Sequence, residues 1–167
     1  MIKYINWLIF IFVCTILQSI INNYLPVYLA PDIALMLVAY MAFFFSYYSA
    51  LIAIIIISYF ASIFSVGSIW FYIFSYTVVF YILVFLRKLF SRSQGIAIAT
   101  IAIITTLLYP FSVLLLSALS QHTSLFVTAL YSALKQIPVN ILCAYILFKY
   151  LPLVCYKLNA KFLSAKI

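Results

Sequence analysis

Two residues of this sequence carry side chains suited to acid–base chemistry, Asp32 and His122, and the chain has no other Asp, Glu or His. Catalysis requires such groups to be held together away from water. Asp32 follows Pro31 at the start of an apolar run, whereas His122 lies in a short polar turn, and neither belongs to a recognisable catalytic motif. Asp32 and His122 could form a pair at the outer membrane surface, but we expect no catalytic residue and no enzyme.

The three cysteines, Cys14, Cys143 and Cys155, lie far apart within or beside apolar runs, and no CxxC pair is present. Metal sites and disulfide frameworks depend on closer or repeated spacing. We therefore interpret the cysteines as small buried hydrophobic residues. No metal site and no cofactor is predicted.

Lys135 lies about ten residues inside an apolar segment, where a charge at the bilayer centre costs roughly 2.5 to 3.5 kcal/mol. Polar residues recur beside it at every fourth position, which places them on one helix face: Thr128, Ser132, Gln136 and Asn140. One hypothesis is that Lys135 and this polar stripe contact a partner's carboxylate or a ligand. The alternative is that Lys135 extends to the membrane surface and the stripe bonds neighbouring helices.

The composition sets the class of protein. Hydrophobic residues make up 70% of the 167 residues and charged residues 6%, and the mean hydropathy is +1.33. A globular domain could not hide so much apolar surface from water. The sequence predicts an all-α polytopic integral membrane protein, with residues 1–167 forming a single transmembrane domain in the lipid bilayer. The net charge of +8 lies at the ends of apolar runs, so nucleic acid is not expected as a partner.

Residues 29–64 determine the number of helices. As one helix their apolar part would be about 50 Å long, against a hydrocarbon core of about 30 Å. We therefore predict two short helices folded back at residues 46–49, the first opened by Pro31 and capped by Asp32, whose carboxylate suits a helix N-terminus. Over the whole chain we expect six transmembrane helices, at about residues 5–21, 31–46, 50–64, 69–86, 96–119 and 125–151.

The basic residues predict the orientation, because cytoplasmic loops are rich in Lys and Arg. Four helices before the loop with Arg87, Lys88 and Arg92, and two after it, place this loop on the same side as Lys3 and the tail beginning at Lys157. A single helix over residues 31–64 would place Lys3 and the loop on opposite faces. The prediction is six crossings with both termini cytoplasmic.

Pro31 and Asp32 precede an apolar run that contains Tyr40 and Ala42, with Leu17, Gln18 and Ser19 upstream and Val66, Gly67, Ser75 and Tyr76 downstream. These residues resemble the MreD family of rod-shape-determining membrane proteins. The family has an outer loop ending in Pro-Asp before an apolar run with Tyr-x-Ala, a Leu-Gln-Ser that closes its first helix, and a small loop before its fourth helix. The family's third helix is rich in glycine and ends in an Asp, whereas residues 57–62 of this chain contain neither.

The resemblance implies a non-enzymatic scaffold of the bacterial inner membrane. Such a protein joins an MreC-like bitopic protein, an MreB-like filament and wall synthases, and helps to position peptidoglycan synthesis during cell elongation. The alternative is the substrate-binding membrane subunit of an energy-coupling-factor vitamin transporter, also a six-helix protein, in which Lys135, Gln136 and Asn140 would hold a small molecule. A membrane-embedded enzyme ranks last.

Overall fold

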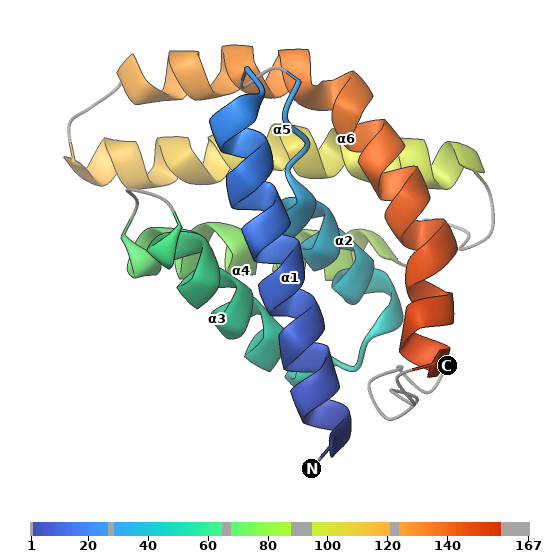
Figure 1. The fold of residues 1–167 in the computed structure, drawn as a ribbon. Coiled ribbons are helices and arrows are strands. Elements are labelled where there is room, and N and C mark those ends of the chain that lie inside the picture. Colours follow the sequence, from blue (N-terminus) through green and yellow to red (C-terminus); the bar gives the residue numbers. More distant parts are fainter. Residues whose placement is uncertain (1, 27–28, 65–67, 88–94, 121–123, 158–167) are drawn as a thin grey trace.

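The protein is described by a computed structural model that covers residues 2–26, 29–64, 68–87, 95–120 and 124–157. Within these ranges the chain is all-helical, and the prediction of six helices is confirmed. The helices (Figure 1) are α1 (Ile2–Tyr24), α2 (Ile33–Phe44), α3 (Tyr47–Ile63), α4 (Ile69–Leu86), α5 (Gly95–Ser120) and α6 (Ser124–Lys157).

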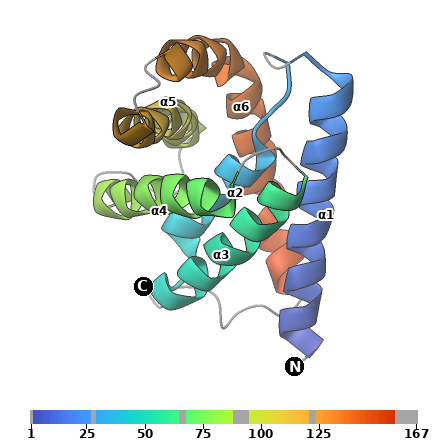
Figure 2. The same cartoon turned by 90° about the vertical axis from the view of Figure 1, so that its left-hand side faces the viewer.

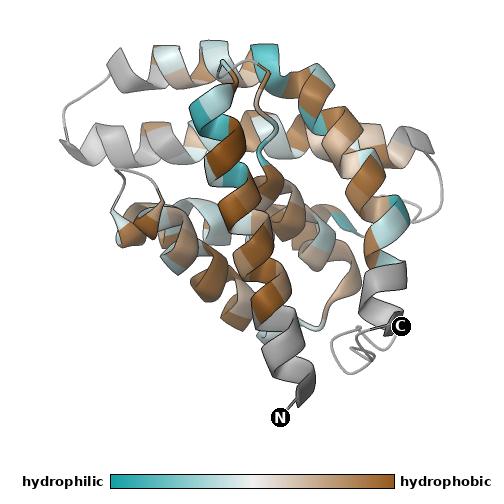
Figure 3. Cartoon of the chain, in the orientation of Figure 1, coloured by the Kyte–Doolittle hydropathy of each residue, from teal (hydrophilic) through white to brown (hydrophobic). Residues whose placement is uncertain are grey.

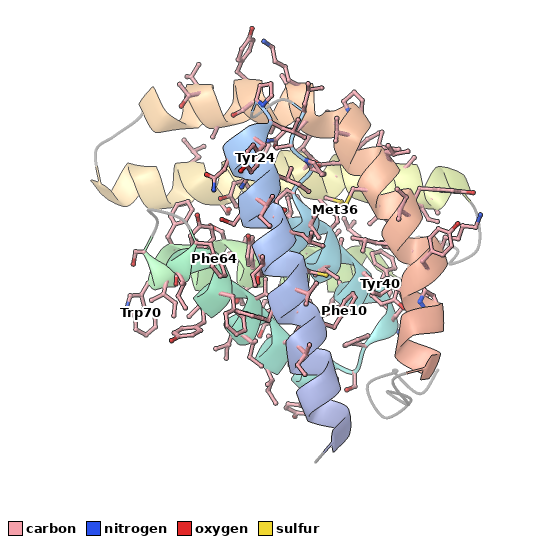
Figure 4. All side chains as sticks on the ribbon, in the orientation of Figure 1. Phe10, Tyr24, Met36, Tyr40, Phe64 and Trp70 are labelled. Atoms are coloured by element: carbon pink, nitrogen blue, oxygen red, sulfur yellow. The ribbon has the colours of Figure 1, made fainter. Side chains whose placement is uncertain are left out.

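Helix α2 is the centre of the fold. It packs against each of the other five helices, and residues 34–43 are all buried. A helix that is apolar on every side is stable only when it is covered on every side. Tyr40, labelled in Figure 4, stacks on Phe44 and meets Phe148 of α6 edge-on, with ring centroids 4.7 and 5.4 Å apart. With 12 residues, α2 is about 18 Å long, well short of a bilayer core.

The break between α2 and α3 occurs at Phe45 and Ser46, at the edge of the turn predicted for residues 46–49. Both residues have extended backbone angles. The Ser46 carbonyl oxygen accepts the first helical hydrogen bond, from the Ala50 backbone N–H at 3.0 Å, and also accepts the Ser49 hydroxyl at 2.9 Å. Residues 29–64 therefore form two helices and not one long one.

The helices do not form a parallel bundle. In Figures 1 and 2 the long axes of α4 and α5 lie across that of α1. Helix α6 is 34 residues long and includes Pro138. Its first part runs alongside α5, and it then bends and runs down towards the start of α1 (Figure 1). A bend is expected where a proline removes a helical hydrogen bond. The beginning of α1 and the end of α6 thus lie at the same end of the molecule.

Two segments, Ile69–Leu86 and Val127–Pro152, are long and apolar enough to cross a membrane, judged by length and composition over the described residues. The other apolar stretches found there are shorter, with 10–17 residues. Large apolar side chains are nonetheless exposed on several helices, among them Tyr48, Trp70 and Phe85 at 75–80%. Figure 3 shows the hydrophilic residues gathered at the end of α1 and on the first part of α6, and hydrophobic colours over most of α2 and α3.

Candidate polar site at the start of α2

Asp32 is the N-cap of α2, the role predicted for it. Its carboxylate accepts a hydrogen bond from the backbone N–H of Leu35 at 2.9 Å, which satisfies one of the N–H groups that every helix start leaves without a helical partner. Pro31 precedes the cap, so it lies just outside the helix and not in its first turn. The second predicted helix therefore begins at Ile33 and not at residue 31.

Two other helices bind the same turn. The Asn140 side chain on α6 accepts a hydrogen bond from the backbone N–H of Asp32 at 2.8 Å, and it donates to the Thr106 hydroxyl on α5 at 3.0 Å. Thr106 in turn donates to the Ala102 carbonyl oxygen at 2.7 Å. Asn140 and Thr106 are both buried. Since buried polar groups are costly unless paired, this series of hydrogen bonds fixes α2, α5 and α6 against each other.

Helix α1 supplies a third contact. The Gln18 side-chain oxygen accepts from the backbone N–H of Ile33 at 2.5 Å, and the Gln18 amide donates to the Asn22 side chain at 3.0 Å. Three backbone N–H groups at the start of α2 are therefore satisfied by three side chains, one each from the cap, α1 and α6.

Two small cavities meet at Asp32. The first, of about 170 Å³, lies between α1, α3, α4 and α5 and is lined in large part by polar and aromatic residues: Thr15, Gln18, Ser19, Asn22, Asp32, Ala34, Ala61, Phe64, Tyr72, Tyr76 and Tyr109. Phe64 lies at the end of α3 and is labelled in Figure 4. The second, of about 190 Å³, is lined by Asp32, Leu35, Thr106, Tyr109, Ala129, Ser132, Ala133 and Gln136. Asp32 and Tyr109 contribute to both cavities.

No Lys, Arg or His lines either cavity among the described residues. Asp32 precedes α2 and lies outside the two segments long enough to span a membrane. Burial raises its pKa from 3.8 to about 6, because the protein removes water from the charged form, and the hydrogen bond from Leu35 opposes this rise. The chain's one acidic side chain therefore lies in a polar site without a basic partner lining it.

Three of the four residues of the predicted polar stripe on α6 face the protein interior. Ser132 and Gln136 are half-buried and line the second cavity, and Asn140 is fully buried in the contact with Asp32. In this arrangement Asn140 is not available to a partner protein. Thr128, at the first position of the stripe, is exposed.

Lys135 does not share the direction of the stripe. It is exposed, and its ammonium lies 4.2 Å from the centroid of the Tyr131 ring on the same helix, a cation–π distance. The structure thus separates the predicted partner-binding residues into an outer group, Lys135 with Thr128, and an inner group, Ser132, Gln136 and Asn140.

Other predicted residues lie elsewhere or outside the described part. Arg87 is the C-cap of α4, whereas Lys88, Arg92 and His122 lie outside the described residues. Cys14 is buried and Cys143 half-buried, and both are free thiols; the side chain of Cys155 is outside the described set. No group of three potential metal ligands occurs among the residues that the structure describes.

Several site residues were not singled out from the sequence as partners of Asp32. Gln18 and Asn140 are 15 and 108 residues away from the backbone groups that they bind, and Thr106, Tyr72 and Tyr109 lie on other helices. The fourfold spacing that ends at Asn140 was a usable signal for an inward polar face. No local pattern marked Thr106 or Tyr109.

Comparison with known proteins does not assign the chain to a family: no model of a protein family, no curated protein and no solved structure matches it.

Proposed function

We propose that this chain is a non-enzymatic, multi-pass scaffold of the bacterial inner membrane, of the MreD type, that serves the cell-elongation machinery. The observation that carries the proposal is the apolar outer surface of the helices. Large aromatic and aliphatic side chains are exposed on α1, α3, α4 and α6, and such faces suit lipid and the helices of membrane partners.

The positions of the two chain ends support the part of the proposed topology that places both termini in the cytoplasm. The beginning of α1 and the end of α6 lie at one end of the molecule (Figure 1), as expected if Lys3 and the tail from Lys157 share the cytoplasmic side. The Pro31-Asp32 pair on which the MreD resemblance rests opens the buried central helix. In a protein of this type such a helix would hold the outer helices in position.

The proposed partner contacts lie on the outer surface. Lys135, Tyr131 and Thr128 form an exposed group on α6, and it suits a carboxylate on an MreC-like bitopic protein or a wall synthase. The predicted basic loop with Arg87, Lys88 and Arg92 would face an MreB-like filament in the cytoplasm.

A vitamin-binding transporter subunit is the second candidate, and the two polar cavities at Asp32 are the observation in its favour. Their volumes, about 170 and 190 Å³, are below the roughly 300 to 1,000 Å³ typical of small-molecule sites. The two polar cavities are therefore too small to hold a vitamin, and the observation in favour of the transporter subunit is weaker than the apolar outer surface that favours the scaffold.

Photo-crosslinking tests the scaffold. A photoreactive amino acid is placed at position 135 in the full chain in native membranes, and the same amino acid at exposed position 59 on α3 serves as the control. We expect position 135 to capture a bitopic coiled-coil protein or a wall synthase more strongly than position 59 does. Capture of an ATPase module, or equal capture at both positions, would contradict the proposal.

A further inference from the structure

The first cavity combines a carboxylate with three tyrosines. Asp32 lines it together with Tyr72, Tyr76 and Tyr109. The tyrosine rings are neighbours, with centroids 5.8 Å apart for Tyr72 and Tyr76 and 6.4 Å apart for Tyr76 and Tyr109. Aromatic rings around a negative charge are the surroundings that organic cations prefer, because the ring faces and the carboxylate both attract positive charge.

The charge of Asp32 is not balanced by a side chain lining the site. The hydrogen bond to its carboxylate in the structure comes from one backbone N–H, that of Leu35, and no Lys, Arg or His lines the cavity among the described residues. Asp32 is half-buried, and a carboxylate that is partly withdrawn from water without a basic partner favours uptake of a proton or of a cation. The walls next to it offer further oxygen acceptors, from Thr15, Gln18, Ser19 and Asn22.

The cavity is of a size that selects small groups. Its volume of about 170 Å³ equals that of roughly five or six water molecules at about 30 Å³ each. An alkylammonium or guanidinium group fits this space, whereas a vitamin does not.

We propose that the first cavity binds an organic ammonium or guanidinium group, with Asp32 as its counter-charge and Tyr72, Tyr76 and Tyr109 as its aromatic walls. The group comes either from a free small cation or from a Lys or Arg side chain of a membrane partner. The site does not depend on the proposed scaffold role, since no residue of α6 lines it among the described residues.

The test uses the full chain purified in detergent with an amine-free phosphate buffer. Methylammonium and methylguanidinium chlorides are titrated, with sodium and potassium chloride at equal ionic strength as controls, and binding is followed by calorimetry and thermal unfolding. We expect saturable binding of the organic cations and a rise in the unfolding temperature. The affinity should fall about tenfold for each pH unit below the pKa of Asp32, since protonation removes the counter-charge.

Tyr72 and Tyr76 on α4, Tyr109 on α5 and Cys143 on α6 are the titratable side chains near Asp32 on the helices packed around it. Tyrosine and cysteine are residue types that ionise in the basic range, so a pH dependence in the acid range reports on Asp32.

Variants locate the binding. Asp32→Asn keeps a good helix cap and removes the charge, so organic-cation binding should be lost. Ser19→Leu fills the cavity from α1 without touching the cap and should have the same effect. Tyr76→Leu should weaken binding at least tenfold, whereas Tyr59→Leu, at an exposed tyrosine on α3, should leave it unchanged. Binding that survives Ser19→Leu, or sodium binding as tight as methylammonium binding, would overturn the proposal.

An experiment in native membranes distinguishes the two sources of the organic cation. A photoreactive amino acid at position 19 that crosslinks to a peptide next to a Lys or Arg identifies a partner side chain, and a retained amine in native mass spectrometry identifies a free cation. A neutral lipid trapped in the cavity would contradict both.

Discussion

Asp32 makes stability depend on pH in a direction opposite to that of most acidic residues. Burial raises its pKa from 3.8 to about 6, so the folded protein holds this proton more tightly than the unfolded chain does. Between these two values the folded state carries more protons, and the free energy of unfolding falls as the pH rises. At about pH 3 and below the carboxyl is largely neutral in both states, and above about pH 6 nearly the full cost of the charge is present.

The size of the effect follows from the shift. Two pKa units correspond to about 3 kcal/mol, at 1.36 kcal/mol per unit. Asp32→Asn resembles the protonated form and remains a good N-cap for Leu35. The variant should equal the wild type at about pH 3 and exceed its stability by about 2 to 3 kcal/mol above pH 6.

The assay is unfolding in detergent across this pH range, in amine-free buffer. The chain has no other Asp or Glu and a single His, so a His122→Gln background leaves Asp32 as the one side chain that titrates in the window. We expect a falling stability curve for the Asp32 protein and a flat one for Asp32→Asn. A wild-type curve that is flat, or that rises with pH, would refute the burial of this carboxylate.

Three further predictions follow from the contacts and the proposed topology. Asn140→Leu removes the acceptor for the Asp32 N–H and should lower the free energy of unfolding by about 1 to 3 kcal/mol. The control Asn23→Leu, at an exposed position, should change it by less than about 0.5 kcal/mol. Equal effects of the two variants would contradict the bridging role of Asn140. Lys135→Leu should weaken capture of the membrane partner with no loss of insertion, measured by pull-down and membrane fractionation, and unchanged capture would remove Lys135 from the partner surface. The topology is tested with single cysteines in a chain in which Cys14, Cys143 and Cys155 are replaced. A membrane-impermeant thiol reagent should label positions 3 and 90 from the cytoplasmic side and position 122 from the other side. Any other distribution would contradict the six-crossing topology.

Local patterns predicted the local structure well. The six apolar runs became six helices, the serine-rich stretch near Ser46 became the break between α2 and α3, and Asp32 became the cap. These features depend on residues a few positions apart. Length and side-chain preference are sufficient to predict them.

The polar site was not predictable in the same way. Asn140 reaches Asp32 across 108 residues of sequence, and its direction depends on how α6 packs against α5 and α2. The fourfold spacing showed that Thr128, Ser132, Gln136 and Asn140 share a face, but not whether that face turns inward. Lys135 was grouped with them because it is adjacent in the chain, although neighbouring residues on a helix point about 100° apart.

The unfavourable charge at Asp32 agrees with the cation site proposed above. A carboxylate that lowers stability at neutral pH is a feature of sites that bind or react, since the cost is recovered when a ligand arrives. A bound organic cation should therefore reduce the pH dependence of stability described above.

The most direct test of the scaffold proposal is a crosslinking pull-down of the full chain from native membranes, with mass spectrometry of the captured proteins and of any retained small molecule. The proposal predicts a bitopic coiled-coil protein together with wall synthases. Recovery of an ATPase module with a vitamin-sized ligand would contradict it and support the transporter subunit.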